Sequence, residues 1–158
     1  MPVTKILIAD DQPMILDGLK AIIASQQGMD VVGMAKTGDE ALQLAQTCHP
    51  DVILLDIYMP GCTGMEALVQ MKQLLPHTPV LLMTSFSQDA LMLKAIEYGA
   101  TGFLLKEWER SALSKRLMMR KMGRWFSRNQ PEKCYRKNCY IMLSKIMTPF
   151  STKFLGIS

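Results

Sequence analysis

The 158-residue sequence lacks any uninterrupted apolar run of the roughly 18 residues that a membrane-spanning helix needs. No basic stretch with an apolar leader precedes the first apolar run, so we expect a cytoplasmic protein with no membrane partner. Four cysteines in a chain of this length are too few for a disulfide-stapled fold. The sequence also has no glycine-rich phosphate loop and no Gly-x-Ser-x-Gly elbow, which argues against two common classes of enzyme.

The chain does have enough apolar residues, 49% of its length, for one core with an appendage. Its charge is divided into two parts. Residues 1–106 hold 6 Lys and Arg against 11 Asp and Glu, whereas residues 107–158 hold 12 against 3. The net charges are therefore −5 and +9. A basic tail of this kind predicts nucleic acid or an anionic surface as a partner, unless the tail was never selected as protein sequence.

Apolar runs typical of buried strands alternate along residues 3–105 with segments whose apolar residues repeat at helical spacing. The predicted strands are residues 3–9, 30–35, 51–56, 79–84 and 101–105. The predicted helices are residues 14–26, a segment that begins at Gly38, residues 65–75 and residues 89–98. Alternation with short links predicts an α/β fold, a doubly wound parallel sheet with helices on both faces.

Polar side chains stand where four of these strands end: Asp10 and Asp11, Asp56, Thr84, and Lys106. The carboxyl ends of parallel strands meet at one edge of a sheet, where ligands bind. Three carboxylates there would repel one another, and Mg²⁺, a hard cation with oxygen ligands, would relieve the repulsion. Each residue alone has a common structural explanation as a helix cap, a turn residue or a solvated lysine. Together they predict a phosphoryl group carried on an aspartate, whose carboxylate is the nucleophile.

Four blocks of the sequence resemble a known family: ILIADDQPMILDGL, DVILLDIYMPGCTGMEAL, PVLLMTSFS and YGATGFLLKE, which together span residues 3–107. They resemble the CheY-like receiver domain of bacterial two-component response regulators. The residues in these blocks are similar to those of the NarL/FixJ subfamily, whose receivers precede a LuxR-type helix-turn-helix. The resemblance implies a flavodoxin-like, five-stranded parallel sheet with strand order 2-1-3-4-5. It implies a receiver domain over residues 1–120.

The resemblance also implies a role for each strand-end residue. Asp56 would be the phosphoacceptor, modified by a sensor histidine kinase in the presence of Mg²⁺. The metal would be held by Asp11 directly, Asp10 through water, Asp56, and the backbone carbonyl of Tyr58. The chain would then be a signalling protein that can form a receiver homodimer, and it would not be an enzyme in its own right.

Three further residues receive roles by the same resemblance. Thr84 and Lys106 would contact the phosphoryl oxygens. Thr84 and Phe103 would form the switch, the aromatic ring turning inward when the threonine moves toward the phosphate. Phe103 can also be read as a strand residue that packs against the fourth helix, and the two interpretations are compatible. Glu107 stands where many members of the family have proline.

Residues 121–158 form a basic tail that departs from the family, since the helix-turn-helix block is absent. Suppose that the reading frame of the coding DNA from Ser114 onward is shifted to start one base earlier. Codons compatible with the printed residues can then encode IEAIDDAKDGKVVFPES, which resembles the fifth helix and linker of the subfamily. The same frame further on gives FFNEILRHL, which resembles the opening helix of a LuxR-type DNA-binding domain. We therefore expect a frameshift near residues 111–114.

These observations favour a phosphoaccepting response regulator of a transcription-regulator lineage that has lost its DNA-binding domain, so that DNA is a doubtful partner. The alternative is a working transcription regulator that binds DNA through the basic tail. A phosphatase with an aspartyl-phosphate intermediate is disfavoured, because Tyr58 stands where a second acid would be needed, two residues after Asp56.

Overall fold

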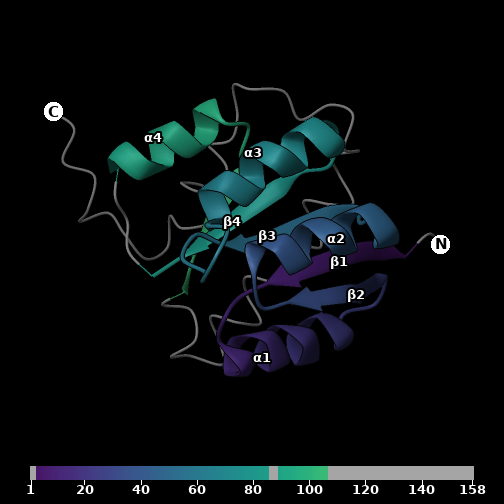
Figure 1. Cartoon of the computed structure of the whole chain (residues 1–158). Helices are drawn as coiled ribbons and strands as arrows, with labels where there is room; N and C mark the ends of the chain where they lie inside the picture. The colour runs from purple at the N-terminus through teal and green to yellow at the C-terminus, as the bar shows by residue number, and fades with distance from the viewer. Residues whose placement is uncertain (1–2, 86–88, 107–158) are drawn as a thin grey trace, which may run out of the picture.

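The computed structural model describes residues 3–85 and 89–106, and these form one parallel sheet flanked by helices (Figure 1). The strand order is β2-β1-β3-β4-β5. The strands are β1 (Thr4–Ala9), β2 (Met29–Ala35), β3 (Val52–Asp56), β4 (Val80–Thr84) and β5 (Gly102–Leu105). The helices are α1 (Pro13–Ala24), α2 (Gly38–Cys48), α3 (Gly64–Leu74) and α4 (Asp89–Glu97). The predicted doubly wound fold and its strand order 2-1-3-4-5 are confirmed.

Alternate residues of the inner strands face opposite sides of the sheet, and each side carries its own apolar cluster. Ile6 and Ile8 of β1 share one cluster with Leu19 of α1. Leu7 of β1 belongs to the other cluster, which is covered by residues of α2, α3 and α4 such as Leu68. In Figure 1, α1 accordingly lies on one side of the sheet and α2, α3 and α4 lie on the other. The inner strands are held in place from both faces.

Local signals explain where the helices begin. Pro13 stands in the first turn of α1, where its missing N–H costs nothing. Thr37 caps α2 by accepting a hydrogen bond from the Glu40 amide at 3.2 Å. A reciprocal capping box joins Thr63 and Glu66 at the start of α3. The proline of α1 and the side-chain caps of α2 and α3 mark the helix starts that follow the carboxyl ends of β1, β2 and β3.

Where both ends of an element were predicted, they match the observed ends within two residues, and α2 begins at the predicted Gly38. The expectation that the strands are buried on both faces is only partly right. It holds for most of β1 and for β3 and β4, whereas most of β2 is half-buried. β2 lies at an edge of the sheet, so it has a neighbouring strand on one side. Among the described residues, no helix is long and apolar enough to cross a membrane. The predicted domain boundary at residue 120, the fifth helix and the tail of residues 121–158 lie outside the described part of the chain.

Candidate functional site

The strand register places the strand-end residues at one edge of the sheet. Ala9 of β1 pairs with Leu55 of β3, so Asp10 and Asp56 leave adjacent strands at the same level. On the other side, Thr84 is the last residue of β4 and pairs with Leu105 of β5. The next residue of the chain is Lys106. Four strands thus deliver their polar residues to a common edge, as predicted from the sequence.

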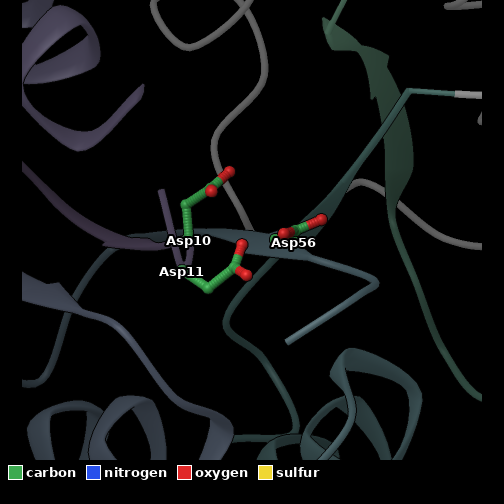
Figure 2. A group of neighbouring side chains, drawn as sticks. All are labelled: Asp10, Asp11 and Asp56. Atoms are coloured by element: carbon green, nitrogen blue, oxygen red, sulfur yellow. The ribbon is translucent and has the colours of Figure 1, made fainter. Parts of the chain in front are cut away.

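Three carboxylates come together there. Asp10, Asp11 and Asp56 each offer an oxygen, and these oxygens lie within 4.8 Å of one another (Figure 2). Asp10 and Asp56 are buried, whereas Asp11 is exposed. Within residues 3–85 and 89–106, this is the one group of three or more such side chains with metal-binding spacing. The cluster therefore has two inner carboxylates and one that faces solvent.

Lys106 supplies the compensating charge. Its ammonium nitrogen lies 2.6 Å from Oδ2 of Asp10 and 3.0 Å from Oδ2 of Asp56. The lysine is itself 7% exposed, so the two ion pairs are shielded from water. One buried cation thus bridges two buried carboxylates, and a single negative charge from this pair is left without a partner.

This imbalance is reflected in the proton affinities. Burial raises the pKa of Asp56, and the nearby charge of Asp10 raises it further, while Lys106 and the Tyr58 amide act in the opposite direction. The outcome is a pKa of about 6 for Asp56, against an ordinary value of 3.8. Burial lowers the pKa of Lys106, but its contacts with Asp10 and Asp56 outweigh this and leave that pKa raised. The lysine is charged at neutral pH, and the aspartate is mostly ionised.

Backbone amides orient the two inner carboxylates. The Gln12 amide donates to Oδ1 of Asp10 at 2.9 Å, and the Tyr58 amide donates to Oδ1 of Asp56 at 3.2 Å. In each case the remaining oxygen, Oδ2, is the one that faces Lys106. Each carboxylate is therefore held by an amide two residues further along the chain.

The donor set fits a hard divalent cation. Mg²⁺ prefers oxygen ligands, and all three side chains of the cluster present carboxylate oxygens. Oδ2 of Asp10 is buried and has no aligned hydrogen bond, its contact being the charge of Lys106. Such an oxygen retains the capacity to accept a further positive partner. The residues present are therefore suited to the predicted metal.

The other predicted residues lie beside this cluster. Thr84 is buried at the end of β4. Phe103 is buried and belongs to the same apolar cluster as Ala95 of α4, in agreement with the packing interpretation of this side chain. The side chain of Tyr58 is half-exposed next to Asp56. Glu107 lies outside the described residues.

The role of Gly64, a glycine next to the site, was not predicted from the sequence. A Cβ on Gly64 would overlap the carbonyl oxygen of Asp56 and would lie 2.7 Å from Cα of Ile57. The Gly64 amide also donates to the carbonyl of Ile57 at 3.0 Å. The start of α3 is thus pressed against the backbone that carries Asp56. The capping signal of Thr63 and Glu66 could have located this helix start, but it could not have revealed the contact.

Comparison with known proteins agrees with this geometry. The family model for the response regulator receiver domain matches residues 6–118. Transcriptional regulatory protein YdfI of Bacillus subtilis is 41% identical over 104 residues, which cover 65% of this chain and 48% of YdfI. The chain thus spans about half the length of that curated relative.

Solved structures show the same fold. The response regulator domain of Thermotoga maritima CheB has a TM-score of 0.69 and 34% identity, covering 80% of this chain and 95% of that one. The receiver domain of the response regulator NarL from Mycobacterium tuberculosis has a TM-score of 0.68 and 30% identity. The match covers 78% of this chain and 98% of the NarL domain. Because the family model matches residues 6–118, which are most of this chain, the chain belongs to the response regulator receiver domain family.

Proposed function

We propose that Asp56 accepts a phosphoryl group from a sensor histidine kinase, in the presence of Mg²⁺, as one step of a two-component phosphorelay. One observation carries this proposal: Asp56 is a buried carboxylate that meets Lys106 at 3.0 Å in a cluster with Asp10 and Asp11. A structural ion pair would need one acid for one base. This site has more negative charge than the lysine can neutralise, which suits a centre that recruits a cation.

The reaction follows from the state of the carboxylate. With a pKa of about 6, Asp56 is ionised at neutral pH and is more basic than an ordinary aspartate. A carboxylate oxygen of Asp56 forms a bond to phosphorus while the bond from phosphorus to the kinase's histidine nitrogen breaks. The other ring nitrogen of the phosphohistidine carries a proton when this bond breaks. The nitrogen that keeps the electron pair therefore leaves as part of a neutral imidazole, and the other product is an acyl phosphate on Asp56.

The other residues bind and orient the group. Asp10, Asp11 and Asp56 would hold Mg²⁺, together with the backbone carbonyl of Tyr58. The bound ion would neutralise charge on the phosphoryl oxygens. Lys106, which lies 3.0 Å from Oδ2 of Asp56, would pair with the same oxygens once Asp56 is modified. Thr84, at the end of the neighbouring strand, would contact them and couple the site to Phe103.

Replacement of the nucleophile tests the proposal. Asp56→Asn should not incorporate stable phosphate from acetyl phosphate and Mg²⁺, because an amide is a far poorer nucleophile than a carboxylate. Asp17→Asn, an exposed position on α1, is the matched control and should behave as wild type. Phosphate incorporation into Asp56→Asn at the wild-type rate would exclude Asp56 as the acceptor.

We also propose that the chain descends from a transcription regulator and is out of frame from about residue 114. One observation supports this: from Ser114 onward the shifted frame resembles the subfamily's linker and DNA-binding domain. The DNA sequence across codons 108–120 tests it. A coding sequence that excludes the shifted reading would overturn the frameshift.

A second candidate function rests on the charge of +9 over residues 107–158, which favours contact with a polyanion. In that case the chain would bind DNA through its tail. Binding that weakens steeply with salt would separate this candidate from a purely phosphoaccepting protein.

A further inference from the structure

The loop between β3 and α3, residues 57–63, lies against the start of α2. A Cβ on Gly38 would overlap the carbonyl oxygen of Cys62 and would lie 3.0 Å from its Cβ and 3.1 Å from its carbonyl carbon. Real Cβ atoms do not make contacts this close to backbone. Gly38 is not among the glycines with positive φ, so space and not backbone conformation requires a glycine here. The N-terminus of α2 therefore touches the loop as closely as the chain allows.

Neither side of this contact can retreat easily. α2 is fixed by its Thr37 cap and by the buried side chains of Ala41, Leu42 and Ala45. On the loop side, the contacting atoms are backbone, and rotation of the Cys62 side chain would not relieve them. A side chain at residue 38 would have to displace either the helix or the loop, and the helix is the more firmly anchored of the two.

The same loop holds the phosphoacceptor carboxylate. Its second residue, Tyr58, donates its amide to Oδ1 of Asp56 at 3.2 Å. Ile57 and Met59 on either side of it are buried and anchor this end of the loop in the core. At the far end, Gly64 is pressed against the carbonyl of Asp56. Cys62 and the Tyr58 amide that orients the carboxylate thus belong to one short loop that is fixed at both ends, and a displacement at Cys62 has few other places to be absorbed.

We propose that Gly38 is a positioning residue for the phosphoacceptor site, through its contact with Cys62 and the loop of residues 57–63. The inference rests on the proposed function of Asp56. It assigns to α2, which contributes no side chain to the acidic cluster, the task of setting where the loop presents the Tyr58 amide. Space at residue 38 then controls how Asp56 meets Mg²⁺ and the phosphodonor.

The test compares three glycine-to-alanine variants of the full chain. Gly38→Ala crowds the loop. Gly33→Ala crowds Leu7 Cδ1 at 2.8 Å between β1 and β2, away from the site, and so controls for a purely structural defect. Gly18→Ala on α1 meets nothing within 4 Å and controls for the added methyl group. Phosphate incorporation from acetyl phosphate is measured against Mg²⁺ concentration, at a temperature where circular dichroism shows each variant folded.

Gly38→Ala should lower the phosphorylation rate, or raise the half-saturating Mg²⁺ concentration, by at least about tenfold, because small misplacements of reacting groups have effects of this size. Gly33→Ala and Gly18→Ala should match wild type, even where Gly33→Ala melts earlier. A Gly38→Ala variant with wild-type rate and wild-type Mg²⁺ dependence would overturn the positioning role alone. So would equal losses in Gly38→Ala and Gly33→Ala. A wild-type chain that takes no phosphate would overturn the proposed function itself.

If Gly38→Ala does not fold, Gly61→Ala carries the same test. Gly61 has φ +77° and lies in the same loop, so a side chain there strains the loop without touching α2 backbone. A Cβ at this residue would lie 3.7 Å from Oδ2 of Asp39, an ordinary contact distance that leaves room for the methyl group. The same reduction in rate or Mg²⁺ response is expected, and its absence in a folded Gly61→Ala variant would contradict the inference.

Discussion

The ammonium of Lys106 lies closer to Asp10, at 2.6 Å from Oδ2, than to Asp56, at 3.0 Å. The lysine therefore pairs with both inner carboxylates, and the shorter contact is with the one that is not the proposed acceptor. Because Asp10 holds the lysine in place, Lys106 is already positioned beside Asp56 before any phosphoryl group arrives. If Asp56 is the acceptor as proposed, the two acids have different roles: Asp10 anchors the lysine and Asp56 reacts.

Removal of this base should destabilise the fold. Lys106→Met leaves two buried carboxylates without a cation, and breaking a buried pair in this way costs on the order of 3 kcal/mol of unfolding free energy. Urea unfolding at neutral pH without metal would measure the loss. Lys20→Met, an exposed position on α1, is the control and should change little. Adding Asp10→Asn to Lys106→Met should restore part of the stability, and a double variant weaker than Lys106→Met would contradict the pairing.

The raised pKa of Asp56 predicts a pH-dependent cost. The folded chain holds this proton up to about pH 6, whereas the unfolded chain releases it near 3.8. Ionised Asp56 therefore destabilises the native state increasingly between about pH 4 and 6, and by a constant amount above that range. Relative to wild type in EDTA, Asp56→Asn should gain stability over this window, reaching on the order of 3 kcal/mol. Equal unfolding free energies of the two proteins from pH 4 to 8 would show that the folded site does not raise the pKa of Asp56.

Magnesium should stabilise the native chain. A ligand that binds only the folded state adds about 2.7 kcal/mol at a hundredfold excess over its dissociation constant. The melting temperature should therefore rise in millimolar Mg²⁺, and Asp11→Ala should lose this response because Asp11 belongs to the acidic cluster. Asp17→Asn should keep it. A wild-type melting temperature that is indifferent to Mg²⁺ would argue against the metal site.

The tail predicts a particular kind of DNA binding. With +9 over residues 107–158 and no helix-turn-helix block in that sequence, any binding should be electrostatic and without sequence preference. Fluorescence anisotropy with two unrelated duplexes should give equal affinities that fall steeply with salt. A footprint confined to one sequence in moderate salt would contradict both the expected frameshift and the loss of the output domain.

The fold and the cluster of acids could be predicted from the sequence because both follow from short-range rules. Apolar runs separated by capped helical segments define β1 to β5, and the carboxyl ends of parallel strands must meet at one edge. Asp10, Asp56 and Lys106 therefore come together once the strands are identified. Their grouping needs no knowledge of side-chain geometry.

Other features depend on distances that no pattern contains. The preference of Lys106 for Asp10 arises from the packing of three side chains in one buried space. The contact between Gly38 and Cys62 joins a helix start to a loop more than twenty residues away in the chain. In the sequence, Gly38 is simply a helix start next to Asp39 and Glu40. The role of such a residue becomes visible when the backbone of its neighbour is in place.

The residues that meet at the edge of the sheet come from strands spread over almost the whole described chain, with Asp10 near its start and Lys106 at its end. During synthesis on the ribosome, Asp10 and Asp56 emerge long before the lysine that compensates them. A nascent chain that ended before β5 would bring two buried acids together without a base, and those acids would have to protonate or stay apart. The receiver sheet therefore gains the cation that compensates its two buried acids only after Lys106 has left the exit tunnel, so the last described strand completes the charge balance of the whole edge.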